Sequence, residues 1–248
     1  MIVIPSFERY DNLKKHTLSF LKRYDIPDSE IVVVVSEHDR QLSQYLTLDC
    51  GVIVTEANKI GDVHNFITDT FDEGEFICEL DDDIRHIKNK DLINIESFTD
   101  LLSTAKNLLV ENKASYCGTY SVPNKMFMNK SNEISLDLKY CLGLIRFRFI
   151  RKEIKCKTSY SEDYENCIRH YVRDGKIIRL NHICGITANY AAGGCDGSGR
   201  NLETERTHKE ELCKLFPNHT TLFQRKNKRY DIRLKDKSPM KIEQDPEM

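Results

Sequence analysis

The sequence contains no long apolar run, no excess of basic residues and no closely spaced pair of cysteines. Its longest strongly apolar stretch, residues 31–35, is far shorter than the roughly 20 residues of a membrane-spanning helix, so we expect no membrane association. The first residues reach Pro5, Glu8 and Arg9 too soon to form the apolar centre of a signal peptide, and we expect a cytoplasmic protein. The formal net charge of −2 argues against binding of nucleic acid through bulk charge, although it is compatible with a local basic patch.

The nine cysteines are odd in number and scattered, and none forms a C-x-x-C motif. They are Cys50, Cys78, Cys117, Cys141, Cys156, Cys167, Cys184, Cys195 and Cys213. Several lie inside apolar runs, as Cys78 does after Phe76 and Ile77. Because the N-terminal segment also lacks an export signal, we expect reduced, buried thiols rather than disulfides, and no zinc site.

Apolar strands and amphipathic helices alternate in residues 1–90. The predicted strands cover residues 2–4, 31–35, 51–54 and 76–80, and the predicted helices cover residues 11–24, 42–46 and 60–74. This order predicts an α/β fold, Rossmann-like, in which helices flank a mostly parallel sheet. Ligands bind such sheets at the carboxyl ends of the strands, where Ser6, Glu37 and Asp81–Asp83 fall.

The second half of the sequence is less regular. We expect helices from Ser97, at 162–175 and at 204–215, strands at 115–120, 140–150 and 177–180, a loop through 126–128 and a glycine-rich loop at 191–199. The tail from His219 is basic to about Lys237 and then polar.

Three consecutive carboxylates, Asp81–Asp83, follow the fourth predicted strand directly. Adjacent carboxylates repel one another, so at neutral pH the group favours a bound cation. Oxygen ligands without thiol or imidazole groups suit Mg²⁺ or Mn²⁺, which also bridge diphosphates. Alternate residues of an extended segment share a face, so we expect the side chains of Asp81 and Asp83 to point the same way. The alternative interpretation is an acidic turn with solvated side chains.

Motifs follow three of the predicted strands: Pro5-Ser6-Phe7-x-Arg9 after the first, a polar pair after the second and Asp81-x-Asp83 after the fourth. Together they resemble the nucleotide-sugar glycosyltransferases of the GT-A fold. The resemblance covers residues 1–90 by motif and order, and residues 140–200 more loosely.

A GT-A-like chain of this kind implies a single catalytic domain over residues 1–218. Residues 1–90 would form the half that binds the nucleotide-sugar, residues 91–218 would form the acceptor-binding half, and residues 219–248 would be a basic C-terminal extension.

The resemblance also implies how the donor is bound. In this family the Asp-x-Asp pair holds Mn²⁺ or Mg²⁺ against the diphosphate, which assigns the metal to Asp81 and Asp83, and UDP-glucose is the donor we favour. The implied nucleotide-sugar-binding residues are Pro5, Ser6, Phe7, Arg9, Glu37, Lys59, Gly61, Asn65, Asp81, Asp82 and Arg200. Glu37, or Ser36, stands where an aspartate is usual, which leaves the base open. Arg200 follows the glycine-rich loop, which would act as a lid or, equally, be a solvent-exposed loop. His182 or His208 is the candidate for a further metal ligand.

Glu162-Asp163, at the start of a predicted helix, resembles the Glu-Asp signature in which one carboxylate is the catalytic base. An inverting transfer needs a base to take the proton of the acceptor hydroxyl, while the metal offsets charge on the leaving diphosphate. We predict Asp163 as this base and Glu162 as the alternate. The alternative interpretation is helix capping, because acidic residues stabilise the positive end of a helix dipole. A retaining transfer would need no such base.

The acceptor is predicted from the resemblance to small viral enzymes. One group glucosylates hydroxymethylated bases in DNA, as the phage and base-J-associated glucosyltransferases do, and the other builds glycans on capsid proteins in cells infected by large algal viruses. Gly193-Gly194 and the basic segment 225–233 resemble the DNA group, and a strand bearing Arg146, Arg148 and Arg151 would add to a basic acceptor groove. We therefore expect modified-base DNA as the acceptor, with a glycan or glycoprotein as the alternative. A solvated tail would explain the basic segment equally well.

Two other functions share part of this pattern. A nucleotidyltransferase also uses paired aspartates on an α/β sheet, but it carries a glycine-rich basic loop after the first strand, where this chain has Pro5-Ser6-Phe7-Glu8-Arg9. An inactive nucleotide-sugar-binding module would not need both Asp81–Asp83 and Glu162-Asp163.

Overall fold

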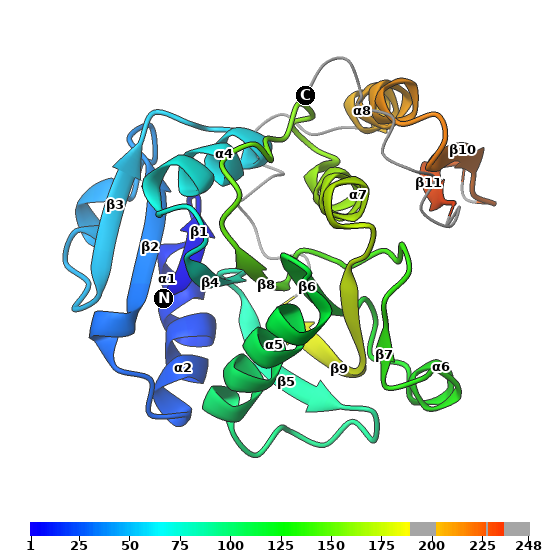
Figure 1. Ribbon diagram of the computed structural model, residues 1–248. Helices are drawn as coiled ribbons and strands as arrows, with labels where there is room; N and C mark the ends of the chain where they lie inside the picture. The colour runs from blue at the N-terminus through cyan, green and yellow to red at the C-terminus, as the bar shows by residue number, and fades with distance from the viewer. Residues whose placement is uncertain (189–201, 227, 236–248) are drawn as a thin grey trace.

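The computed structural model describes residues 1–188, 202–226 and 228–235, and a mixed sheet runs through its centre (Figure 1). The strand order in these residues is β3 (Gly51–Thr55), β2 (Ile31–Ser36), β1 (Ile2–Ser6), β4 (Phe76–Leu80), β8 (Ile145–Phe149), β6 (Tyr116–Tyr120), β9 (Ile178–Thr187) and β5 (Ile84–Asn89), with β7 (Ile134–Ser135) paired to β9. Strands β3, β2, β1 and β4 are parallel, as are β6 and β9. The predicted α/β fold is confirmed, and β5, β7 and β8 are its antiparallel members.

Helices cover both faces of this sheet. One face carries the N-terminal helical segment, made of α1 (Tyr10–Leu13), the π turn η1 (Lys14–Leu18) and α2 (Ser19–Arg23), together with α5 (Phe98–Asn112). The opposite face carries α4 (Ile60–Thr70) and α7 (Glu162–Asp174). Alternate strand residues supply the two cores: Ile2 and Ile4 pack on the first face, while Val3 packs with Ile67 of α4. The apolar run at 31–35 is divided between the faces in the same way.

Strand β8 corrects one prediction. Ile145 and Phe147 pack in the core beneath α5, whereas Arg146 and Arg148 contact α7 and α4 on the other face. Each arginine is only 3% exposed, because β8 lies inside the sheet with helices on both sides. The predicted basic groove at these positions is therefore wrong. An alternation of arginine with apolar residues suggests a half-exposed strand, but here ion pairs compensate the buried charges.

Several further elements differ from the sequence-based expectation. Residues after the aspartates form β5, and the predicted loop through 126–128 is a short helix, α6 (Lys125–Lys130), which Asn124 caps. A short 3-10 turn, η2 (Asp28–Glu30), precedes β2. The helix α3 (Leu42–Tyr45) follows β2. Near the C-terminus, α8 (Leu202–Leu215) leads into an antiparallel hairpin of β10 (Thr220–Gln224) and β11 (Tyr230–Leu234). Ile232 of this hairpin packs in the same core as α7 and α8.

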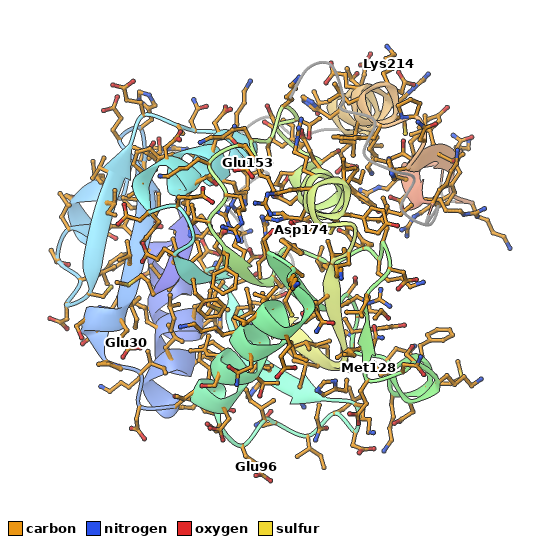
Figure 2. The ribbon with its side chains drawn as sticks, in the orientation of Figure 1. Glu30, Glu96, Met128, Glu153, Asp174 and Lys214 are labelled. Atoms are coloured by element: carbon orange, nitrogen blue, oxygen red, sulfur yellow. The ribbon has the colours of Figure 1, made fainter. Side chains whose placement is uncertain are left out.

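The surface and the core separate as the composition predicts. Charged side chains such as Glu30, Glu96 and Lys214 are exposed and lie at the outside of the molecule (Figure 2). All eight cysteines in the described residues are free thiols, and six of them are buried, as expected. In the same residues no helix has the length and apolar character that crossing a bilayer requires.

Candidate active site

A cavity of about 260 Å³ lies at the carboxyl ends of β1 and β4, beside the first residues of α4 and α7. The predicted site residues that line it are Pro5, Ser6, Phe7, Arg9, Asp81, Asp82, Glu162 and Asp163. They meet because β1 and β4 are neighbours in the sheet and α7 begins over the adjacent strand β8. The tertiary structure thus joins the motifs of both halves of the chain in one cavity.

Asp82 anchors the segment that follows β1. Ser6 donates a hydrogen bond of 2.7 Å to one oxygen of Asp82, and Arg9 donates one of 3.3 Å to the other. Burial raises the pKa of Asp82 to about 6, even though Arg9 and Ser6 favour its charged form. Tyr45 of α3 completes the cluster, with its hydroxyl 2.8 Å from the Ser6 hydroxyl and accepting from the Arg9 backbone at 3.0 Å. Tyr45 was missed in the sequence, where it lies in a short helix without a motif.

Asp81 presents its carboxylate to the cavity, while its backbone is held by Leu144 and Thr17. Its side chain has no hydrogen-bond partner among the described residues. Burial raises the pKa of Asp81 well above its usual range, and the carboxylates of Asp83, Asp82 and Asp163 act in the same direction.

Asp83 does not share this orientation. The chain turns at 82–83, so Asp83 does not line the cavity, and its carboxylate lies 3.9 Å from Arg9. Its backbone carbonyl accepts a hydrogen bond of 3.1 Å from Ala188. The extended backbone expected from Asp81 to Asp83 is not found, because a turn at 82–83 follows the strand, and of the two residues Asp81 alone lines the cavity.

The donor set at Asp81 fits a hard divalent cation that is shared with a substrate. Three further carboxylates, of Asp82, Glu162 and Asp163, line the same cavity. No group of three or more His, Cys, Asp or Glu side chains in the described part of the chain forms a metal cage. Mg²⁺ is commonly bound by one or two carboxylates together with substrate phosphates, and this arrangement matches that pattern.

Neither candidate histidine lies at the cavity. His182 of β9 makes a 2.9 Å hydrogen bond with the Glu133 carbonyl, and His208 of α8 lies 3.1 Å from Glu211. Neither histidine lines the cavity that contains Asp81, so the structure does not support their predicted role as metal ligands.

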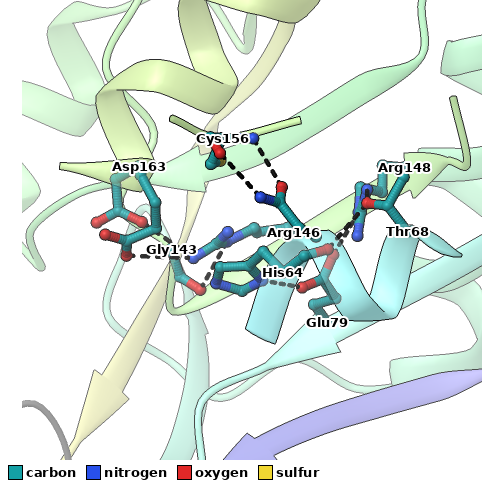
Figure 3. Close-up of polar contacts among 10 residues, drawn as sticks. His64, Thr68, Glu79, Gly143, Arg146, Arg148, Cys156 and Asp163 are labelled. Carbon is teal, nitrogen blue, oxygen red and sulfur yellow. Dashed lines mark hydrogen bonds and ion pairs between the residues drawn. The ribbon is translucent and has the colours of Figure 1, made fainter. Parts of the chain in front are cut away.

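Asp163 is held in place by Arg146 (Figure 3) and by Tyr140. Arg146 donates a hydrogen bond of 3.0 Å to Oδ1 of Asp163, and the Tyr140 hydroxyl donates one of 3.3 Å to Oδ2. The same guanidinium donates to the Gly143 carbonyl and lies 3.9 Å from Glu162. A Cβ atom at Gly143 would lie 2.1 Å from Arg146 and 2.2 Å from Asp163, so this ion pair requires glycine there.

A buried charge network supports Arg146 from within the protein. On β4, Glu79 lies opposite Arg146 in the register of β4 and β8 and forms an ion pair with Arg148. His64 of α4 hydrogen-bonds the other Glu79 oxygen at 2.7 Å (Figure 3). Burial alone would raise the pKa of Glu79, but Arg148 and His64 outweigh it and hold that pKa well below the usual range. Charges of alternating sign therefore lead from Asp163 into the core.

Four predicted donor-binding residues in the described part of the chain do not line the cavity: Glu37, Lys59, Gly61 and Asn65. Glu37 is exposed, and its neighbour Ser36 lines the cavity instead. Lys59 is exposed at the start of α4, where Asn58 and Ile60 reach the cavity. Gly61 lets α4 approach the loop before α7, since a Cβ atom there would lie 2.4 Å from the Thr158 carbonyl. Arg200 and the glycine-rich loop at 191–199 lie outside the described residues.

Asn65 has a structural role in this fold. Its side-chain amide donates to the Cys156 carbonyl at 2.8 Å and accepts from the Cys156 N–H at 2.7 Å. Both bonds tie α4 to the loop that leads into Glu162, and Asn65 does not line the cavity.

We therefore expect Asn65→Ala to lower the free energy of unfolding by about 2 kcal/mol, because it leaves two buried backbone groups without partners. Asn58→Ala is the matched control, since Asn58 is exposed and lines the cavity. Urea denaturation of both variants should show a loss of stability only for Asn65→Ala. A stable Asn65→Ala protein with weakened donor binding would restore the sequence-based role.

Comparison with known proteins supports the fold assignment. No protein-family profile and no curated protein matches the sequence. Residues 1–349 of S. aureus TarS, in complex with UDP-GlcNAc, match with a TM-score of 0.54 and 20% identity over 86% of this chain and 66% of that one. The chain thus spans slightly less than two thirds of the TarS chain.

A second match is glucosyl-3-phosphoglycerate synthase from Mycobacterium tuberculosis in complex with Mn²⁺, UDP-glucose and glycerol 3-phosphate. It has a TM-score of 0.52 and 11% identity over 90% of this chain and 83% of that one. A mycobacterial protein matches with a TM-score of 0.53 and 11% identity over 95% and 83%. These similarities establish that the chain has the GT-A fold of nucleotide-sugar glycosyltransferases.

Proposed function

We propose that this protein is a metal-dependent glycosyltransferase that moves a sugar from a nucleotide-sugar to an acceptor hydroxyl. One observation carries the proposal: Asp81, whose side chain has no hydrogen-bond partner among the described residues, and Asp163, oriented by Arg146, line the same cavity. Two proteins of the same fold bind UDP-GlcNAc or UDP-glucose, which supports a nucleotide-sugar as the donor.

On the donor side, Asp81 would contact the metal, with Asp83 the second ligand implied by the motif. When bound, a divalent cation offsets the charge that develops on the leaving diphosphate. The segment Pro5–Arg9, which Asp82 anchors, would hold the nucleoside. UDP-glucose is the first donor to test.

On the acceptor side, Asp163 would remove the proton of the attacking hydroxyl. The acceptor oxygen then bonds to the anomeric carbon while the bond from that carbon to the diphosphate breaks, which inverts the configuration. The predicted acceptor in viral DNA is not part of this proposal. Arg146 and Arg148 are buried, and Arg225 of the basic segment is already paired with Asp231.

The metal role is tested by donor binding in thermal-shift assays. UDP-, GDP- and TDP-sugars should raise the melting temperature with Mn²⁺ or Mg²⁺, and a ligand at 100 times its Kd adds about 2.7 kcal/mol to stability. Asp81→Asn should weaken this metal-dependent binding at least tenfold, whereas Asp72→Asn, at an exposed position after α4, should not. Equal stabilisation in EDTA would contradict the metal role, and no response to any nucleotide-sugar would contradict the function.

A further inference from the structure

A second cavity, of about 510 Å³, adjoins the first. Ile60, Leu142, Glu162 and Asp163 line both cavities, so Asp163 lies at their boundary. The outer wall of the second cavity is formed by α8 and the β10–β11 hairpin. Its volume falls within the range of about 300–1,000 Å³ that is common for small-molecule sites.

Four tyrosines line this second cavity: Tyr140, Tyr160, Tyr164 and Tyr230. Tyr140 and Tyr164 stack on each other with ring centroids 4.2 Å apart, and Arg206 lies 4.7 Å from the centre of the Tyr230 ring. A tyrosine combines a flat apolar ring with a polar tip. A sugar ring has the complementary surface, because its C–H groups form apolar faces and its hydroxyls form a polar rim.

The charges of the second cavity are already paired. Arg225 donates to Asp231 at 2.7 Å, and the Tyr164 hydroxyl donates to the same carboxylate at 2.9 Å. Burial would raise the pKa of Asp231, but Arg225 and Tyr164 hold it below its usual value. Lys209 donates to the Tyr230 carbonyl at 2.8 Å and lies 3.9 Å from Glu205.

These pairs decide between charged and uncharged ligands. The lining contains four carboxylates, of Glu162, Asp163, Glu205 and Asp231, but three cations, of Lys209, Arg225 and Arg229. A phosphate-bearing acceptor would lie beside these carboxylates and would compete with Asp231 for Arg225. A hydroxyl can donate to a carboxylate and accept from a cation, so a polyhydroxylated molecule needs no pair to break.

We infer that the second cavity is the acceptor site and that it takes an uncharged saccharide or polyol, with the reacting hydroxyl at Asp163. The inference rests on the proposed function and specifies its substrate class. In the transfer the acceptor oxygen gains the bond to the anomeric carbon, its proton passes to Asp163, and the nucleoside diphosphate leaves with the electron pair of the broken bond.

A transfer assay with three acceptor types tests the substrate class. Methyl glycosides and disaccharides, sugar phosphates, and DNA oligonucleotides with hydroxymethylcytosine or hydroxymethyluracil are each supplied with the donor that binds best. We expect transfer to the uncharged saccharides at least tenfold faster than to the others. Preferred transfer to sugar phosphate or to DNA would overturn the inference.

Variants of residues that line the second cavity test whether the acceptor binds there. Tyr230→Ala and Tyr160→Ala come from separate segments, and each should raise the KM for the acceptor at least tenfold while the donor Kd is unchanged. Phe127→Ala is the matched control, because Phe127 is an aromatic residue of α6 that is half exposed and lines neither cavity. Melting temperatures identify any variant that fails to fold.

Donor binding and donor hydrolysis distinguish a failure of the proposed function from a failure of the acceptor-site assignment. If no nucleotide-sugar binds, the proposed function is wrong and the acceptor assignment falls with it. If the donor binds and is hydrolysed but folded Tyr230→Ala and Tyr160→Ala keep the wild-type KM for the acceptor, only the acceptor site is wrong.

Discussion

Replacement of Asp163 by asparagine should lower the turnover of sugar transfer by about 10²–10⁴-fold, the range that a positioned general base contributes. Asparagine can still accept the hydrogen bond from Arg146, but it cannot take up the proton of the acceptor hydroxyl. Donor affinity should be unchanged, so the loss should be in turnover. Steady-state transfer kinetics, together with donor Kd values from titration, measure both quantities.

Glu162→Gln is the natural comparison for this variant. Glu162 lies one residue away on the same helix turn, but it is 3.9 Å from Arg146 where Asp163 is 3.0 Å. We expect Glu162→Gln to lose far less turnover. The opposite ranking would assign the base to Glu162, and full turnover in both variants would show that neither carboxylate is the base, as a retaining reaction allows.

Replacement of Glu79 by leucine should cost about 3–5 kcal/mol in the free energy of unfolding, the usual loss when one partner of a buried ion pair is removed. Glu79 is 2% exposed and is the charged partner of Arg148 and the hydrogen-bond partner of His64. Without it, the buried Arg148 guanidinium keeps, among the described residues, only its hydrogen bond to Thr68. Urea denaturation at neutral pH measures the loss.

Removal of both charges separates the contribution of the ion pair to stability from the contribution of side-chain packing. The double variant Glu79→Leu with Arg148→Met should be more stable than Glu79→Leu alone, because no uncompensated guanidinium remains at that position. A double variant no more stable than Glu79→Leu alone would contradict a coupled pair.

The same carboxylate predicts a pH dependence of stability. Because the folded protein holds the pKa of Glu79 below the unfolded value of about 4.3, its contribution is complete above that pH and declines as the pH falls. The stability difference between the wild-type protein and Glu79→Leu should therefore shrink on acidification. A difference that stays constant from pH 7 to pH 3 would contradict this.

Local patterns predicted the first half of the fold well. The apolar run at 31–35 and the amphipathic helix from Ile60 formed β2 and α4, because burial on one or two faces leaves a period in the sequence that can be recognised. Ser6 and Asp81 were placed correctly at one cavity, because neighbouring parallel strands end at the same edge of a sheet. These predictions depend on residues close together in the chain.

The sequence by itself therefore determined the alternation of strands and helices, the polar ends of β1 and β4, and the carboxylates that begin α7. The tertiary structure alone decided the rest. Arg148 meets Glu79 from 69 residues away, and Asn65 meets Cys156 from 91 residues away. A guanidinium in a strand is a surface group or a buried ion pair according to what lies opposite it, and only the packing of sheet and helices brings that partner into contact.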